Sequence, residues 1–202
     1  MDRAWRYDGR IPGSPTLPFY SVCPVMLHMY RSSRMFTTYC RRPHEGGKGA
    51  FVMTKILFIC HGNICRSPMA EFVMKDLVEK AGLSDRFRIA SAATSTEEIG
   101  NPVYPPARKE LARHGISCMG KTARQVKRSD YSDYDLLVCM DNWNIRNTLR
   151  IVGSDPEGKI CSLLDFAGRK GEEVADPWYT GDFEETWDDV LAGCKGLLEK
   201  YK

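Results

Sequence analysis

The sequence has no apolar run of about 20 residues, the length that an α-helix needs to cross a bilayer. Its most apolar N-terminal stretch, residues 19–29, is interrupted by Pro24 and His28, and no small-residue cleavage site follows it. This pattern differs from that of a secretory signal peptide. We therefore expect a cytoplasmic protein with no membrane partner.

The sequence also lacks the short, regular cysteine spacings of secreted, disulfide-rich domains. Its 8 cysteines are scattered through segments with strand-like and helix-like patterns. A reducing compartment is the simpler interpretation, in agreement with a cytoplasmic location.

An excess of basic residues is absent from most of the chain. Residues 1–52 hold eight Lys and Arg against three Asp and Glu, whereas residues 53–202 hold 21 against 23. The net charge of +3 therefore comes from the first quarter of the chain. Because the rest has no basic excess, we expect no nucleic-acid partner.

Residues 1–52 lack a sustained helical or strand periodicity. They contain five prolines and end in the glycine-rich stretch 43–49, which is typical of a linker. We expect a poorly ordered segment, either upstream sequence or a dispensable extension, with Met53 as the native start of one domain over residues 53–202. Mass spectrometry of the native N-terminus tests this expectation, and a peptide from before Met53 would contradict it.

From Lys55 onward, apolar strand-like segments alternate with amphipathic helix-like segments. This alternation predicts a single α/β domain whose four-stranded parallel sheet has helices on both faces. Ligands of such sheets bind beyond the carboxyl ends of the strands. The strands are predicted at 55–60, 87–90, 135–140 and 159–166, and the helices at 68–81, 105–114, 141–153 and 182–201, with a short helix within 123–131.

The segment Cys60-His61-Gly62-Asn63-Ile64-Cys65-Arg66-Ser67-Pro68 connects the first predicted strand to the first predicted helix. A loop over a helix N-terminus directs backbone N–H groups and the positive end of the helix dipole inward, which makes a site for a phosphate-like oxyanion. The same field stabilises a thiolate, so Cys60 is predicted to be a nucleophile. Arg66 can return across the loop and hold two phosphate oxygens. The predicted phosphate-binding residues are His61, Gly62, Asn63, Ile64, Cys65 and Arg66.

With three further motifs, Ala123-Arg124-Gln125, Cys139-Met140-Asp141 and Asp176-Pro177-Trp178-Tyr179, the chain resembles the low-molecular-weight protein tyrosine phosphatases over residues 55–201. The resemblance implies hydrolysis of protein phosphotyrosine through a phosphocysteine on Cys60. It assigns Arg66 as the phosphate clamp and Asp176 as the acid that protonates the leaving oxygen and then activates water. It implies no cofactor and no metal, and partners that are phosphotyrosine proteins and a cognate tyrosine kinase.

The resemblance also implies smaller roles for other residues. Loop support is expected from Asn63, which holds a strained conformation, from Ser67, which hydrogen-bonds the thiolate, and from Ser91 and His114 behind the loop. Trp178 and Tyr179 are expected to form an aromatic gate for the phosphotyrosine ring. Cys65 is expected to form a reversible disulfide with Cys60 that protects it from over-oxidation.

Three alternative functions compete with this interpretation. Protein-arginine phosphatases of the same fold carry threonine where this chain has Ile64, and they lack the paired aromatic residues after Asp-Pro. Thioredoxin-linked arsenate reductases use a downstream Cys-x6-Cys pair, whereas Cys139 is followed seven residues later by Arg146. A non-catalytic phosphate-binding module is the third alternative. His61 and the pair Glu97-Glu98 depart from some relatives and leave the peptide preference open.

Overall fold

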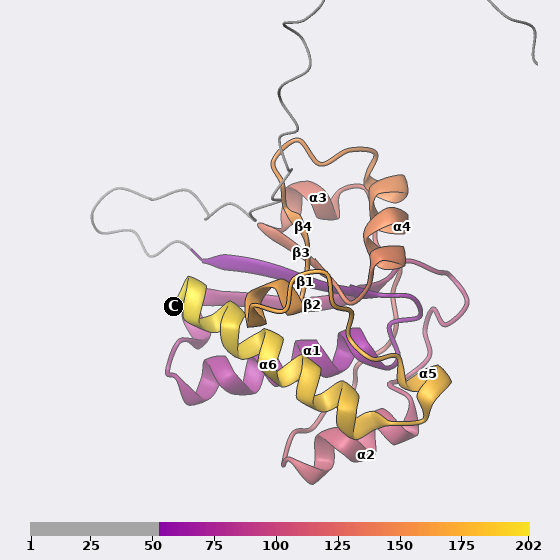
Figure 1. Ribbon diagram of the computed structural model, residues 1–202, viewed down its shortest axis with the longest axis vertical. Coiled ribbons are helices and arrows are strands. Elements are labelled where there is room, and N and C mark those ends of the chain that lie inside the picture. Colours follow the sequence, from indigo (N-terminus) through magenta and orange to yellow (C-terminus); the bar gives the residue numbers. More distant parts are fainter. Residues whose placement is uncertain (1–52) are drawn as a thin grey trace, which may run out of the picture. The chain divides into compact units, whose positions relative to one another are not determined.

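The computed structural model describes residues 53–202, so the expectations for residues 1–52 lie outside the described part and stay predictions. The described chain alternates strands and helices as the sequence predicts (Figure 1). No helix within residues 53–202 is long and apolar enough to span a bilayer. The elements are β1 (Thr54–Cys60), α1 (Arg66–Lys80), η2 (Ser84–Arg86), β2 (Phe87–Ala93), α2 (Pro105–Arg113), α3 (Asp130–Asp133), β3 (Leu136–Cys139), α4 (Asn142–Val152), β4 (Ile160–Ser162), η3 (Leu164–Ala167), α5 (Pro177–Thr180) and α6 (Phe183–Tyr201).

The four strands form one parallel sheet in the order β2-β1-β3-β4, which confirms the predicted fold class. β1 lies inside the sheet, and the side chains of residues 56–59 are fully buried. A strand that is covered on both faces reads as a continuous apolar run, and the sequence of β1 has this property. Cys60, its last residue, therefore lies at the carboxyl edge of the sheet.

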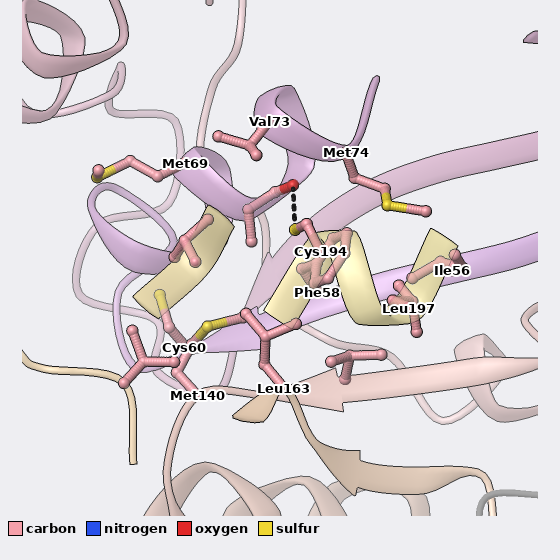
Figure 2. Packing of buried hydrophobic residues seen from close by; sticks show 14 of the residues in the cluster. Ile56, Phe58, Cys60, Met69, Val73, Met74, Met140, Leu163, Cys194 and Leu197 are labelled. Atoms are coloured by element: carbon pink, nitrogen blue, oxygen red, sulfur yellow. Dashed lines mark hydrogen bonds between the residues drawn. The ribbon is translucent and has the colours of Figure 1, made fainter. Parts of the chain in front are cut away.

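The two faces of β1 pack into two separate cores. Ile56 and Phe58 face a core with α1, α2 and α6, whereas Leu57 and Ile59 face a second core toward α3 and α4. Figure 1 shows α1, α2 and α6 on one side of the sheet and α3 and α4 on the other. Figure 2 shows the first core, where the Cys194 thiol of α6 donates a hydrogen bond of 3.6 Å to the Ala70 carbonyl oxygen of α1.

Two predicted elements differ from the structure. β4 covers only Ile160–Ser162, and the rest of the predicted strand 159–166 turns into η3. Leu163 and Leu164 are both fully buried in the core beside α6, and successive residues of a strand would point to opposite faces. The helix predicted within 123–131 is reduced to α3, because residues 124–126 extend beside the end of β2 and exchange backbone hydrogen bonds with Ala93.

Gly196 marks the closest approach of α6 to η3, because a Cβ atom built there would overlap the Phe166 carbonyl oxygen. Glycine inside a helix costs about 1 kcal/mol relative to alanine, so this close approach explains its presence. We expect Gly196→Ala to lower the free energy of unfolding by about 2–3 kcal/mol, since backbone atoms cannot move aside easily. Denaturant titration measures this, with exposed Lys195→Ala as the control, expected within about 0.5 kcal/mol of wild type. Equal stability of the two variants would contradict the close approach of Gly196 to the Phe166 backbone.

Candidate active site

A cleft of about 600 Å³ opens at the carboxyl edge of the sheet, where β1 and β3 end. Its floor is the loop from Cys60 to Arg66, and its walls come from Glu97 and Glu98, from the start of α4, and from α5. α4 and α5 lie at this end of the sheet (Figure 1). The predicted nucleophile, phosphate clamp and acid, Cys60, Arg66 and Asp176, all line this cleft.

The loop is held in shape by Asn63, the only non-glycine residue among 53–202 with a positive φ, which is 57°. A left-handed conformation is costly for such a residue unless its surroundings hold it. The fully buried Asn63 side chain donates hydrogen bonds to the Ser67 and Ser91 hydroxyls at 2.9 and 2.8 Å, and accepts one from the Arg124 backbone N–H at 3.2 Å. The structure thus brings together three of the four residues predicted to support the loop.

The Cys60 thiol lies at the centre of this loop with only 3% of the residue exposed. Its Sγ is 3.0 Å from the Ser67 hydroxyl and accepts a hydrogen bond from the Asn63 backbone N–H at 3.3 Å. Ser67 belongs to the first turn of α1, which begins at Arg66, two residues before the predicted start. The positive end of the α1 dipole therefore lies beside the sulfur, where it favours a negative charge.

Arg66 is buried, and its guanidinium is held by two carboxylates. Nη1 donates to Asp141 Oδ2 at 2.7 Å, and Nη2 is 2.5 Å from Asp176 Oδ2. Burial lowers the pKa of Arg66, but the negative groups of Cys60, Asp176 and Asp141 outweigh it and raise the pKa above its ordinary value. Arg66 is thus a permanent cation that lines the cleft and is held between Asp141 and Asp176.

Sequence reasoning missed the role of Asp141 in orienting Arg66. It placed Asp141 only in a family motif and at the start of the predicted helix 141–153, where the structure shows it as the cap of α4, accepting a hydrogen bond of 2.6 Å from the Asn144 backbone N–H at Oδ1. The other carboxylate oxygen binds Arg66. The available signal was the position of Asp141 two residues after the end of β3, the strand that pairs with the one ending in Cys60.

Behind the loop lies a buried carboxylate, Glu71, which was also missed. Ser91 Oγ donates to Glu71 Oε2 at 2.5 Å, and the Nζ atoms of Lys121 and Lys75 lie 3.1 and 2.5 Å from its oxygens. Burial raises the pKa of Glu71, but the charge of Lys121 and the contacts of Lys75 and Ser91 lower it below its ordinary value. A signal was present in the sequence, because Glu71 precedes Met74 by three residues and Val78 by seven and so shares the apolar face of the predicted helix.

We expect Glu71→Gln to lower the free energy of unfolding by about 3 kcal/mol at neutral pH, because it leaves partly buried Lys121 without its anion. Since folding lowers the pKa of Glu71, its contribution is complete above the unfolded-state pKa and is lost as the pH falls through the folded-state pKa. Unfolding titrations from about pH 7 to about pH 3 should therefore show a shrinking difference from wild type. Exposed Glu79→Gln on the same helix is the control, and a pH-independent difference would contradict the ion pair.

His114 does not join this network, contrary to expectation. It follows the last turn of α2, its Nε2 lies 3.2 Å from Glu110 Oε1, and its ring stacks on Trp187 of α6 with the centroids 3.6 Å apart. The basic residue behind the loop is Lys121, whose Nζ also donates to the Ser91 carbonyl oxygen at 3.1 Å. His114 instead joins α2 to α6.

The predicted aromatic gate lies on α5, directly after Asp176. Trp178 and Tyr179 line the cleft and are 61% and 86% exposed. Asp176 Oδ1 accepts the Trp178 backbone N–H at 3.1 Å, so the acid and the gate belong to one short turn. Tyr104, which sequence reasoning did not include, packs its ring 5.7 Å from that of Trp178.

Cys65 differs from Cys60 in its surroundings. Its side chain packs with Ile64 and Ala123, and partly buried Phe183 covers this cluster. Burial, followed by the charge of Cys60, raises the pKa of the Cys65 thiol to about 12. Cys65 is therefore a neutral thiol at physiological pH.

Comparison with known proteins agrees with this geometry. The family model described as low molecular weight phosphotyrosine protein phosphatase matches residues 55–202. The low molecular weight protein-tyrosine-phosphatase YfkJ of Bacillus subtilis is 41% identical over 147 residues, which are 72% of this chain and 94% of YfkJ. The low molecular weight phosphotyrosine protein phosphatase of Rattus norvegicus is 41% identical over 149 residues, with the same two shares.

Solved structures give the same result. The crystal structure of YfkJ has a TM-score of 0.71 at 40% identity, covering 76% of this chain and 96% of YfkJ. The crystal structure of DARP, a Drosophila arginine phosphatase, has a TM-score of 0.68 at 31% identity, covering 74% of this chain and 98% of DARP. Because the matching pattern spans the whole described domain and nearly the full length of these relatives, the chain belongs to the low molecular weight phosphotyrosine protein phosphatase family.

Proposed function

We propose that this protein hydrolyses phosphotyrosine on proteins through a phosphocysteine intermediate on Cys60. The observation that carries the proposal is the convergence of three groups on one cleft. These are the Cys60 thiol beside the α1 N-terminus, the Arg66 guanidinium, and the Asp176 carboxylate 2.5 Å from it. Together they supply a nucleophile, an anion clamp and a proton donor.

In the first step, the Cys60 thiolate attacks phosphorus and the bond from phosphorus to the tyrosine oxygen breaks. Asp176 gives its proton to the leaving oxygen, a contribution of typically about 10²–10⁴-fold. In the second step, water attacks the phosphocysteine, Asp176 accepts a proton from that water, and the phosphorus–sulfur bond breaks. Inorganic phosphate leaves and the thiolate is restored.

Arg66 and the loop N–H groups stabilise the charge on the phosphoryl oxygens in both steps. Because Asp176 contacts Nη2 of Arg66, a phosphate that binds this nitrogen takes the place of the carboxylate. Asp176 then lies beside the bound phosphoryl group, where it can reach the leaving oxygen. Asp141 keeps its hydrogen bond to Nη1 and holds the guanidinium in place.

The aromatic gate supports phosphotyrosine as the substrate, because Trp178 and Tyr179 can hold a flat ring above the phosphate site. Ile64 on the floor supports the same choice over phosphoarginine, since the resemblance associates threonine with arginine phosphatases. The fold does not separate the two, because DARP shares it and is named an arginine phosphatase.

The test is hydrolysis of one peptide prepared with either phosphotyrosine or phosphoarginine, without added metal. We expect kcat/KM for the phosphotyrosine form to be larger by at least about tenfold. Faster hydrolysis of the phosphoarginine form would make phosphoarginine the substrate instead. The variant Ile64→Thr tests whether Ile64 determines the preference between the two forms. Hydrolysis of neither form would favour a phosphate-binding module, and thioredoxin-dependent reduction of arsenate would favour the reductase.

We also propose that Cys65 protects Cys60 from over-oxidation. A peroxide oxidises the Cys60 thiolate to sulfenic acid, and the Cys65 thiol condenses with it, releasing water and forming a disulfide. Peptide mapping after mild peroxide treatment is expected to show a Cys60–Cys65 linkage that dithiothreitol reverses. Irreversible sulfinic acid on Cys60 without any linkage would contradict this role.

The proposed reaction implies phosphotyrosine proteins as partners and a tyrosine kinase that supplies them. A cytoplasmic location is part of the same proposal. It is supported by the free thiols of five buried cysteines within residues 53–202, as expected in a reducing compartment: Cys60, Cys65, Cys118, Cys139 and Cys194.

A further inference from the structure

Trp143 lines the wall of the cleft that α4 forms. Sequence reasoning gave it no role. It stands in the first turn of α4, and 62% of the residue is exposed. An exposed tryptophan at the edge of a cleft is a typical recognition residue, because it offers a large, rigid apolar surface at low entropic cost.

The backbone on both sides of Trp143 is fixed. The Asn142 backbone N–H and side-chain amide both donate to Glu173 Oε1, at 3.0 and 2.8 Å. The Asn144 backbone N–H donates to Asp141, whose other oxygen holds Arg66. The position of Trp143 is thus tied to the phosphate site, so its ring has a defined place relative to a bound phosphoryl group.

The charges around the cleft are mainly negative. Four carboxylates line it, against Arg66 as the only lysine or arginine in the lining. Asp141 and Asp176 are paired with Arg66, whereas the Glu97 carboxylate lies 3.2 Å from His61 Nε2 and the Glu98 carboxylate accepts a hydrogen bond from the Asn101 side-chain amide. The pair Glu97-Glu98 is therefore an acidic rim with no lysine or arginine partner within residues 53–202.

We infer that Trp143 and the acidic rim together select substrates with a basic side chain next to the phosphotyrosine, an inference that rests on the proposed function. The flat face of Trp143 binds the aliphatic stem or the cation of a lysine or arginine, and Glu97 and Glu98 supply the complementary charge. The ring already accommodates a cation, since the Arg146 guanidinium lies over it at 5.1 Å from its centroid.

Arg146 offers the opposite possibility, that acidic side chains are selected. The cleft geometry favours the basic choice, because Arg146 is not among the residues that line the cleft, whereas Glu97 and Glu98 are. A substrate residue at the rim therefore meets the carboxylates first. Peptides with basic or acidic flanking residues separate the two possibilities.

The experiment measures kcat/KM for three phosphotyrosine peptides that differ only in the two residues flanking the phosphotyrosine, which are Lys, Ala or Glu. At about 50 mM salt, where surface charges are weakly screened, we expect the Lys peptide to exceed the Glu peptide by about tenfold in wild type. The difference should lie in KM, because contacts to flanking residues are the same in the ground and transition states.

Trp143→Ala and the double variant Glu97→Gln/Glu98→Gln should each reduce the Lys-to-Glu ratio to about threefold or less, while Trp143→Phe keeps most of it. Met119→Ala is the matched control, since Met119 is 86% exposed but lies outside the cleft, and its ratio should equal that of wild type. About 500 mM salt should lower the wild-type ratio by screening.

Equal hydrolysis of all three peptides by wild type would overturn this inference and leave the proposed function intact. A preference for the Glu peptide that Arg146→Gln removes would overturn it in favour of acidic substrates. An unchanged Lys-to-Glu ratio in Trp143→Ala would overturn the assignment of Trp143 as a residue that selects basic substrates. Hydrolysis of none of the peptides would overturn the proposed function and this inference with it.

Discussion

Cys60→Ser is expected to slow hydrolysis of phosphotyrosine peptides by at least about 10⁴-fold, because a serine hydroxyl is not ionised at neutral pH and is a far weaker nucleophile. The protein should still fold, since the smaller Oγ can keep the contacts that Sγ makes with the Ser67 hydroxyl and the Asn63 N–H, at 3.0 and 3.3 Å. Single-turnover kinetics measure the loss, and calorimetric titration with inorganic phosphate tests whether the loop still binds anions.

Cys65→Ser is the matched control within the same loop. The thiol of Cys65, with a pKa of about 12, is neutral and takes no part in the attack. We expect this variant to keep activity within about tenfold of wild type, the loss being limited to loop packing. Similar losses in both variants, or substantial turnover by Cys60→Ser, would contradict the assignment of the nucleophile.

Asp176→Asn is expected to lower kcat on phosphotyrosine peptides by about 10²–10⁴-fold, since an amide cannot protonate the leaving oxygen. Asparagine retains an oxygen for the Trp178 backbone N–H, so the α5 turn should persist and KM should change less than kcat. Asp176→Ala removes this cap as well, and comparing the two variants separates proton transfer from positioning of the loop.

The loss of activity in Asp176→Asn is expected to depend on the acidity of the leaving group. An aryl phosphate with a more acidic phenol needs less protonation, so the variant should lose less activity on it than on phosphotyrosine. Asp141→Asn is the matched control, because it removes the other carboxylate on Arg66 and should weaken phosphate binding without this dependence. An Asp176→Asn enzyme within about threefold of wild type would assign the acid to another group.

The parts of the fold that were predictable are those encoded by local patterns. β1 is a continuous apolar run, and Asp141 and Asp182 cap the two helices that they precede. The errors fall where tertiary packing decides the structure. Leu163 and Leu164 look like strand residues, but both must enter the core beside α6, which a strand does not allow.

The site residues likewise include some that the sequence predicts and others that only the folded structure reveals. The loop from Cys60 to Arg66 is contiguous in the sequence, so its chemistry follows from the order of its residues. Its partners Glu71, Lys121 and Trp143 come from α1, a loop and α4, and only the folded chain brings them to the cleft or behind it. His114 shows the opposite error, since a histidine in a suggestive position proved to pack on α6.

The proposed mechanism requires a covalent phosphocysteine on Cys60, which can be trapped. Asp176→Asn, which lacks the group proposed to activate water, is mixed with a phosphotyrosine peptide, quenched in acid within one turnover and digested for mass spectrometry. We expect phosphate on the peptide that contains Cys60 and none on that peptide in Cys60→Ser. Release of dephosphorylated peptide within that turnover, with no phosphate on Cys60, would contradict it.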